Sequence, residues 1–149
     1  MPSTAFAHLL RREKERVLVR WELGARTLAS AAWHSHPELL NSLPPFLDWL
    51  AERLEHPNDT EEADRDAFAR HHALERLRGG YDLVELLAEM ALLRECLLRI
   101  WEEAPQDIAP TEVRRMNEEL DDVVALSVVA YVRAMAVDRA AGPADCVPA

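Results

Sequence analysis

Glycine and proline, the residues that most often end regular structure, are scarce in this chain. Its 149 residues contain 4 glycines and 9 prolines, and neither type occurs at positions 81–104 or 111–141. Segments of this length without a breaker favour long helices over short strands joined by glycine turns. The sequence therefore predicts an all-α protein.

Apolar side chains within these segments recur every three or four residues, the spacing that places them on one side of a helix. We predict a helical bundle of four long helices, over about 3–32, 61–78, 82–104 and 111–141. Ser3 or Thr4 is expected to cap the first helix, and one or two shorter helices fall within 38–55. Residues 1–141 are expected to form one helical domain, with 142–149 as a flexible tail or linker stub.

Charge and cysteine content restrict the possible partners and compartment. The chain carries 17 basic and 27 acidic residues, a net charge of −10, whereas binding to nucleic acid requires a cationic surface. Two cysteines without metal spacing suit a reducing compartment. The most apolar segment, 123–137, contains Ser127 and Arg133 and is shorter than the roughly 20 residues of a membrane span. We expect a cytoplasmic protein that binds neither nucleic acid nor membranes.

The sequence contains no recognisable catalytic or metal-binding motif. His34 and His36 flank one serine, and His71 and His72 are adjacent, whereas helical zinc sites use histidines four residues apart. Carboxylate pairs are common, but no helix carries the Glu-x-x-His of di-iron bundles. We therefore expect no enzyme activity, no metal site and no cofactor. A bundle that holds haem or a metal through His71 or His72 is the alternative.

Arg94 is predicted to lie on the apolar face of its helix, between Met90 and Trp101. An arginine there must extend to solvent, pair with a carboxylate or bind an anionic ligand. Structural pairing with Glu75, Glu89 or an acid of the last helix is the favoured interpretation. The functional interpretation of Arg94 is a ligand or switch site inside the bundle.

The last predicted helix has an apolar surface wider than one neighbouring helix would cover. Such a helix is either central in the bundle or also contacts a second copy of the chain. We therefore expect a homodimer, with interface candidates Val128, Val129, Val132 and Met135.

The segment from His72 to Tyr81, together with the leucine-rich segment 83–94, resembles the N-terminal domain of RsbRD-type co-antagonists of the bacterial stress response. Similar domains precede the kinase core of some sensor histidine kinases. The family pattern is a His, an Arg four residues later, Gly-Tyr or Gly-Phe, and a leucine-rich helix carrying Glu and Leu-Arg. Ala73 and Met90 depart from it. The residues that match it are His72, Arg76, Gly80, Tyr81, Glu89, Leu93 and Arg94.

This resemblance implies a helical sensory domain, usually fused to an output domain, whose signal is undefined. The ligand-binding or switch candidates are His72, Arg76, Tyr81, Glu89 and Arg94. The resulting hypothesis is a non-catalytic bacterial signalling module that senses a signal or binds a partner protein. A bundle that binds a small molecule, haem or a metal remains the alternative function.

Overall fold

The computed structural model describes residues 4–104 and 107–142, and within these ranges it contains helices but no strands. The all-α prediction is therefore confirmed. The elements in chain order are α1 (Ala5–Ala25), the short 3-10 helix η1 (Ala29–Trp33), α2 (His36–Leu40), α3 (Leu43–Glu55), α4 (Glu62–Arg78), α5 (Leu83–Glu102) and α6 (Pro110–Ala141).

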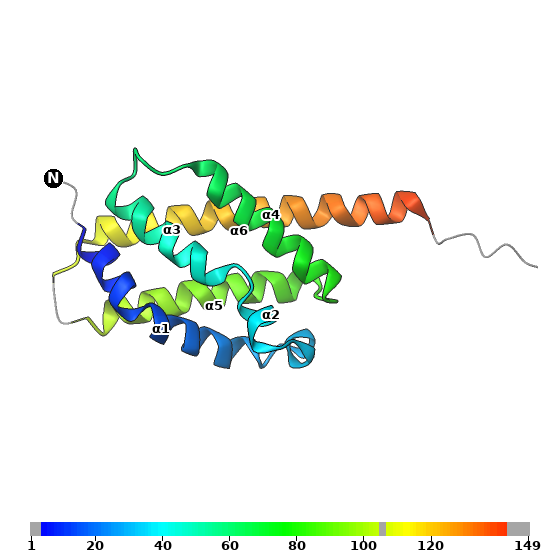
Figure 1. Cartoon of the computed structure of the whole chain (residues 1–149), viewed down its shortest axis with the longest axis horizontal. Helices are drawn as coiled ribbons and strands as arrows, with labels where there is room; N and C mark the ends of the chain where they lie inside the picture. Colours follow the sequence, from blue (N-terminus) through cyan, green and yellow to red (C-terminus); the bar gives the residue numbers. More distant parts are fainter. Residues whose placement is uncertain (1–3, 105–106, 143–149) are drawn as a thin grey trace, which may run out of the picture.

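The helices form a bundle in which α1 packs against α3 and α5, while α4 packs along α6 (Figure 1). Large buried side chains of α1, α3, α5 and α6 fill its core, among them Phe6, Trp21, Leu50, Leu97 and Met116. The 32 residues of α6 make it the longest helix, and its C-terminal turns project beyond the other helices (Figure 1).

The predicted end of the first helix is wrong. Helix α1 stops at Ala25 instead of continuing to residue 32, because Leu28 adopts an extended conformation. Tertiary contacts outweigh local helix propensity here. Ser30, in η1, hydrogen-bonds through its backbone N–H and its hydroxyl to the carboxylate of Glu85 near the start of α5. Arg26 donates to the carbonyl of His34 at 2.6 Å.

Glu112, rather than a capping side chain, secures the beginning of α1. The predicted cap Thr4 makes no side-chain hydrogen bond, and Ser3 lies outside the described residues. Buried Glu112 of α6 instead accepts hydrogen bonds from the backbone N–H groups of Phe6 and Ala109, each at 3.1 Å. One carboxylate thus ties the starts of α1 and α6 together.

The turn between α4 and α5 fixes the position of Tyr81. Gly80 has a φ of 88°, a left-handed conformation that other residues adopt at an energetic cost. Asp82 then caps α5 by accepting a hydrogen bond from the Glu85 backbone N–H at 2.8 Å. Tyr81, between them, turns inward and is 1% exposed.

None of the helices in the described ranges is long and apolar enough to cross a membrane. The predicted tail or linker stub at 142–149 lies, apart from Gly142, outside the described residues.

Candidate functional site

A buried network of charged side chains connects α4 and α5. His72 and Arg76 are four residues apart on one side of α4, and Glu89 faces them from the second turn of α5. Their exposed fractions are 2%, 1% and 1%. Charged groups are rarely buried this completely unless they pair with one another.

Glu89 accepts hydrogen bonds from both partners. Arg76 Nε lies 3.0 Å from Glu89 Oε1 and 2.9 Å from Oε2, and His72 Nε2 lies 3.0 Å from Oε2. Burial acts to raise the pKa of Glu89, but the hydrogen bonds and electrostatic attraction from His72 and Arg76 outweigh it and lower that pKa below its usual value. The carboxylate therefore stabilises the fold at neutral pH, and this contribution disappears as the pH falls through the folded-state pKa.

Arg76 also holds α2 in place. Its Nη1 donates to the backbone carbonyl of Glu38 at 3.1 Å, and its Nη2 donates to that of Leu39. Both carbonyls belong to the last turn of α2, where a helix leaves carbonyl groups without an internal partner. The guanidinium therefore bridges the carboxylate on α5 and the end of α2.

The network extends to α1 and α6. On one side, the indole N–H of Trp21 in α1 donates to the backbone carbonyl of Glu89 at 3.2 Å. On the other, the Arg76 guanidinium lies 5.0 Å from the centre of the Tyr81 ring, within cation–π range. The Tyr81 carbonyl in turn accepts a hydrogen bond from the hydroxyl of Tyr131 in α6 at 2.8 Å. Four of the long helices and α2 thus meet at this network.

Two buried polar atoms of the site make no hydrogen bond of good geometry among the described residues, Nδ1 of His72 and the hydroxyl of Tyr81. The hydroxyl nevertheless lies close enough to the Glu89 carboxylate to interact with it, so His72 Nδ1 is the atom without any such contact. Burial, followed by the charge of Glu89, raises the pKa of Tyr81 well above its usual value, so the hydroxyl stays protonated and keeps a proton to donate. A buried polar group without a partner is costly, and it offers a contact to a ligand, water or a rearranged side chain.

A surface cleft of about 490 Å³ leads to Arg76 from outside. It lies between α2 and the end of α4, and charged and polar groups contribute much of its lining. The lining residues are His34, Pro37, Glu38, Asn41, Glu75, Arg76, Arg78 and Gly79. Arg76 is only 1% exposed, so a small polar molecule in this cleft would contact α2 first and would reach the guanidinium only if α2 moved.

Arg94 makes its polar contacts outside this network. It donates to Asn117 at 2.9 Å and pairs with Asp121, both on α6, and its side chain is 30% exposed. Five residues after Glu89 on the same helix, it points about 140° away from it. An acid of the last helix was one of the structural partners predicted for Arg94, and Asp121 is that partner. The other four candidates, His72, Arg76, Tyr81 and Glu89, lie together.

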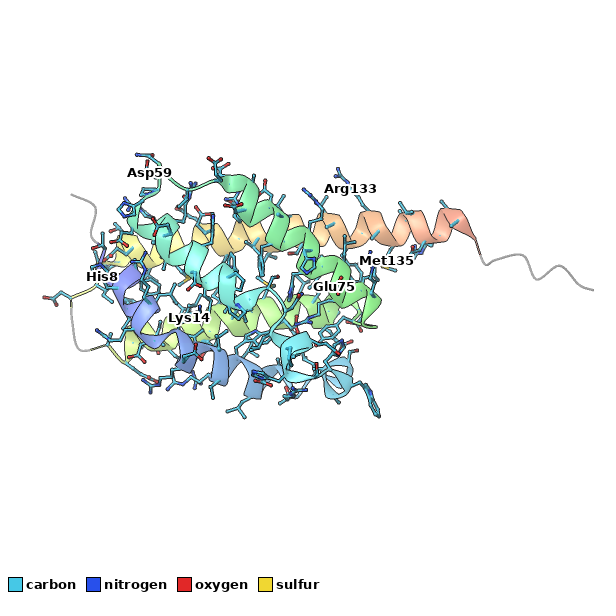
Figure 2. All side chains as sticks on the ribbon, viewed as in Figure 1. His8, Lys14, Asp59, Glu75, Arg133 and Met135 are labelled. Atoms are coloured by element: carbon cyan, nitrogen blue, oxygen red, sulfur yellow. The ribbon has the colours of Figure 1, made fainter. Side chains whose placement is uncertain are left out.

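The four interface candidates divide between two sides of α6. Val129 and Val132 are 44% and 50% exposed. Val128 is half-buried, and Met135 packs against a small cluster formed by Ala73, Leu86 and Tyr131. Figure 2 shows Arg133 on the outer edge of α6 and Met135 on the side nearer α4 and α5.

The remaining histidines serve in local contacts. His34 donates from Nδ1 to the Ser30 carbonyl and stands edge-on to the Tyr81 ring. His36 pairs with Glu22, and exposed His71 contacts Asn41. Glu52, Glu55 and His56 bring three potential metal-ligand atoms within 4.8 Å, but Arg11 pairs with both carboxylates.

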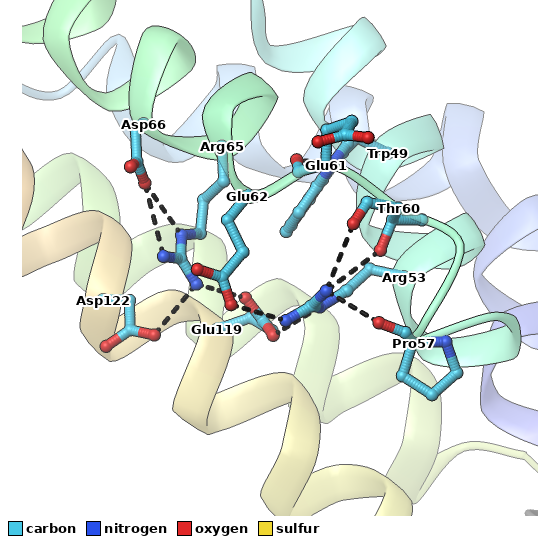
Figure 3. A network of polar contacts seen from close by, with 10 residues as sticks. All are labelled: Trp49, Arg53, Pro57, Thr60, Glu61, Glu62, Arg65, Asp66, Glu119 and Asp122. Carbon is cyan, nitrogen blue, oxygen red and sulfur yellow. Dashed lines mark hydrogen bonds and ion pairs between the residues drawn. The ribbon is translucent and has the colours of Figure 1, made fainter.

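A second polar network lies at the opposite end of α4 (Figure 3). Glu119 of α6 accepts from Arg53 at 3.0 Å and from Arg65 at 2.9 Å, and Arg65 also pairs with Asp122 at 2.9 Å. Arg53 further binds Glu62 and the carbonyl of Pro57. These complementary contacts join α3, α4 and α6, so we interpret this network as structural.

Sequence reasoning missed the contributions of Trp21, Tyr131 and the α2 carbonyls. Trp21 and Tyr131 fit their apolar stripes, and nothing in the pattern distinguished a side chain that packs from one that also donates a hydrogen bond. The role of α2 depends on backbone groups, which carry no sequence signal.

In comparisons with known proteins, the chain matches no protein-family model, no curated protein and no solved structure. The resemblance to RsbRD-type domains therefore stays a prediction.

Replacing Glu89 by glutamine should destabilise the protein by about 3–5 kcal/mol, because it leaves the buried Arg76 guanidinium without a counter-charge. Glu95→Gln is the matched control on the same helix. Glu95 is 56% exposed and pairs with exposed Arg99, so its loss should cost under about 1 kcal/mol. Urea unfolding of both variants measures the difference, and equal effects would contradict the importance assigned to the buried pair.

Proposed function

We propose that this protein is a non-catalytic bacterial signalling module, in which a signal acts on the packing of helices around Arg76. The observation that carries the proposal is the double engagement of this arginine. Its guanidinium binds Glu89 on α5 and the terminal carbonyls of α2 at once. A molecule or protein that competes for either set of contacts changes how α2 docks on the bundle.

Accessibility and spare hydrogen-bonding capacity support a sensory role. The polar cleft beside α2 borders Arg76, which is only 1% exposed and meets the cleft through a small part of its surface. His72 Nδ1 makes no hydrogen bond among the described residues, and the Tyr81 hydroxyl has only its interaction with Glu89. A displaced arginine or an entering ligand would therefore find polar groups to bind. The charged groups already neutralise one another, which favours a change of packing over chemical attack on a substrate.

A route from the site to α6 supports signal transmission. Tyr81 lies against Arg76, and its carbonyl accepts the hydrogen bond from Tyr131, in the second half of α6. Movement at Arg76 that shifts Tyr81 would alter this contact and the position of α6. In the proposed module, α6 carries the change to a second copy of the chain, a partner protein or a fused output domain. A ligand contributes only by binding the two arrangements unequally.

Hydrogen exchange tests this coupling without knowledge of the signal. In Arg76→Lys the positive charge stays, but one ammonium cannot reproduce the planar contacts to Glu89 and both carbonyls. We expect amide exchange to accelerate on the order of tenfold in α2 and around Tyr131, equivalent to about 1.4 kcal/mol of lost local stability. The helix start held by Glu112 should change little.

Arg94→Lys provides the control, because that arginine is half-exposed and contacts neither α2 nor Tyr81. It should leave exchange in α2 unchanged. Uniform acceleration along the whole chain in Arg76→Lys would indicate simple destabilisation, and unchanged exchange in α2 would refute the switch.

Native mass spectrometry separates this function from a ligand- or cofactor-binding bundle. Buried His72 with its unpartnered Nδ1 is the observation that favours the alternative. Untagged protein should appear at the bare chain mass, as a dimer at high concentration. Extra mass that matches haem, a metal or a metabolite, and that is lost in His72→Asn, would favour the alternative.

A further inference from the structure

One strip of the exposed surface of α6 changes from charged to apolar halfway along the helix, with exposed Arg133 beside it. In the first half the exposed side chains include Arg114, Glu118, Asp121 and Asp122. From Ala125 onward the exposed positions at spacings of four, three and four are Ala125, Val129, Val132 and Ala136. At 100° per residue these four lie within an arc of roughly 60°.

This apolar stripe faces away from the rest of the bundle. All four of its residues are exposed, while the buried residues of the same segment, Val123, Ser127 and Tyr131, lie on the opposite side. A groove of about 310 Å³ between α4 and α6 borders the stripe at Val129 and adds Leu74 and Val137 to the apolar surface. The last turns of α6 project beyond the other helices (Figure 1), and the four stripe residues are exposed.

We propose that the stripe binds a second copy of the chain, with the two α6 helices antiparallel. This inference deepens the proposed function, since it specifies the surface and geometry of the expected homodimer. Spacings of four, three and four are those of a coiled-coil seam. Centring an antiparallel pair between positions 130 and 131 places Val129 in a layer with the partner's Val132, and Ala125 in a layer with the partner's Ala136.

Charge selects this arrangement over a parallel one. Three residues beyond each alanine, the same register places Asp122 in a layer with the partner's Arg139, and this happens at both ends of the helix pair. Asp122 pairs with Arg65 at 2.9 Å through one carboxylate oxygen but is 59% exposed, so it can also meet a second cation, and Arg139 is exposed near the end of α6. A parallel pair in register would instead oppose Asp122 to the partner's Asp122 and Arg139 to the partner's Arg139. Opposite charges thus meet only in the antiparallel pair.

The size of the seam predicts a reversible dimer. It contains about two heptads, and the small alanines allow the helices to approach closely but bury little apolar surface. We therefore expect dissociation in the micromolar range.

Sedimentation of the full-length chain between about 1 µM and 1 mM tests the surface. The wild type should shift from monomer to dimer over this range, and Val132→Glu should weaken the dimer at least about tenfold by burying an unpaired charge. Val84→Glu is the matched control, because Val84 is 75% exposed on α5 and lies outside the seam. A monomeric wild type, or equal effects of the two variants, would overturn the proposal.

A charge exchange tests the antiparallel register. Asp122→Arg and Arg139→Asp should each weaken the dimer about tenfold, and the double variant should recover most of the wild-type affinity. Positions 122 and 139 are about 25 Å apart along one helix, so rescue requires contact between two copies. Thermal unfolding at low concentration controls for the lost Arg65–Asp122 contact. A dimer that neither single variant weakens, or that the double variant does not restore, would overturn the antiparallel register.

Failure here is distinguishable from failure of the proposed function. If the wild type is monomeric while Arg76→Lys still accelerates exchange in α2, this interface is overturned and the switch stands. If the charge exchange restores the dimer but Arg76→Lys leaves exchange in α2 unchanged, the interface stands and the switch is overturned.

Discussion

The ion pair between Arg76 and Glu89 is the constraint on which the arrangement of the other helices depends. Moving two charges out of water carries a large desolvation cost, which only close geometry and further hydrogen bonds can offset. The site provides both, through His72 on the carboxylate and the α2 carbonyls on the guanidinium. These directional contacts fix the relative positions of α2, α4 and α5, whereas apolar packing alone tolerates small shifts. A contact with such strict geometry is also one whose disturbance changes the packing.

Helix α6 connects this constraint to the surface. Its inner side receives the Tyr131 hydrogen bond to Tyr81, and its outer side carries the exposed apolar stripe. At its start, Glu112 and the Glu119 network anchor it to α1, α3 and α4. The helix is therefore held firmly at one end, contacted in its second half by the switch candidate, and free of the bundle at the other end. This gradient suits a helix that transmits a change in packing.

Sequence patterns predicted the helices well where packing and local preference agree. The Gly79-Gly80 end of α4 and the Asp82 start of α5 depend on backbone chemistry that residue types reveal. The end of α1 could not be predicted in this way, because it depends on the hydrogen bond between Ser30 and Glu85, which is 55 residues away in the sequence. Likewise, the spacing of His72 and Arg76 placed them on one face, but only tertiary structure brings Glu89 opposite them. Arg94 matches the same resemblance yet faces α6, since helical rotation separates it from Glu89.

A double-mutant cycle on Arg76 and Glu89 tests the central claim most directly. Arg76→Met and Glu89→Leu should each destabilise the fold by about 3–5 kcal/mol, because each leaves the other member of the ion pair buried without its main counter-charge. The double variant has no such charge, so it should be more stable than the sum of the single losses predicts by more than about 2 kcal/mol. Urea unfolding of the four proteins gives this coupling energy. Additive losses would contradict the claim that the two side chains act as one buried unit.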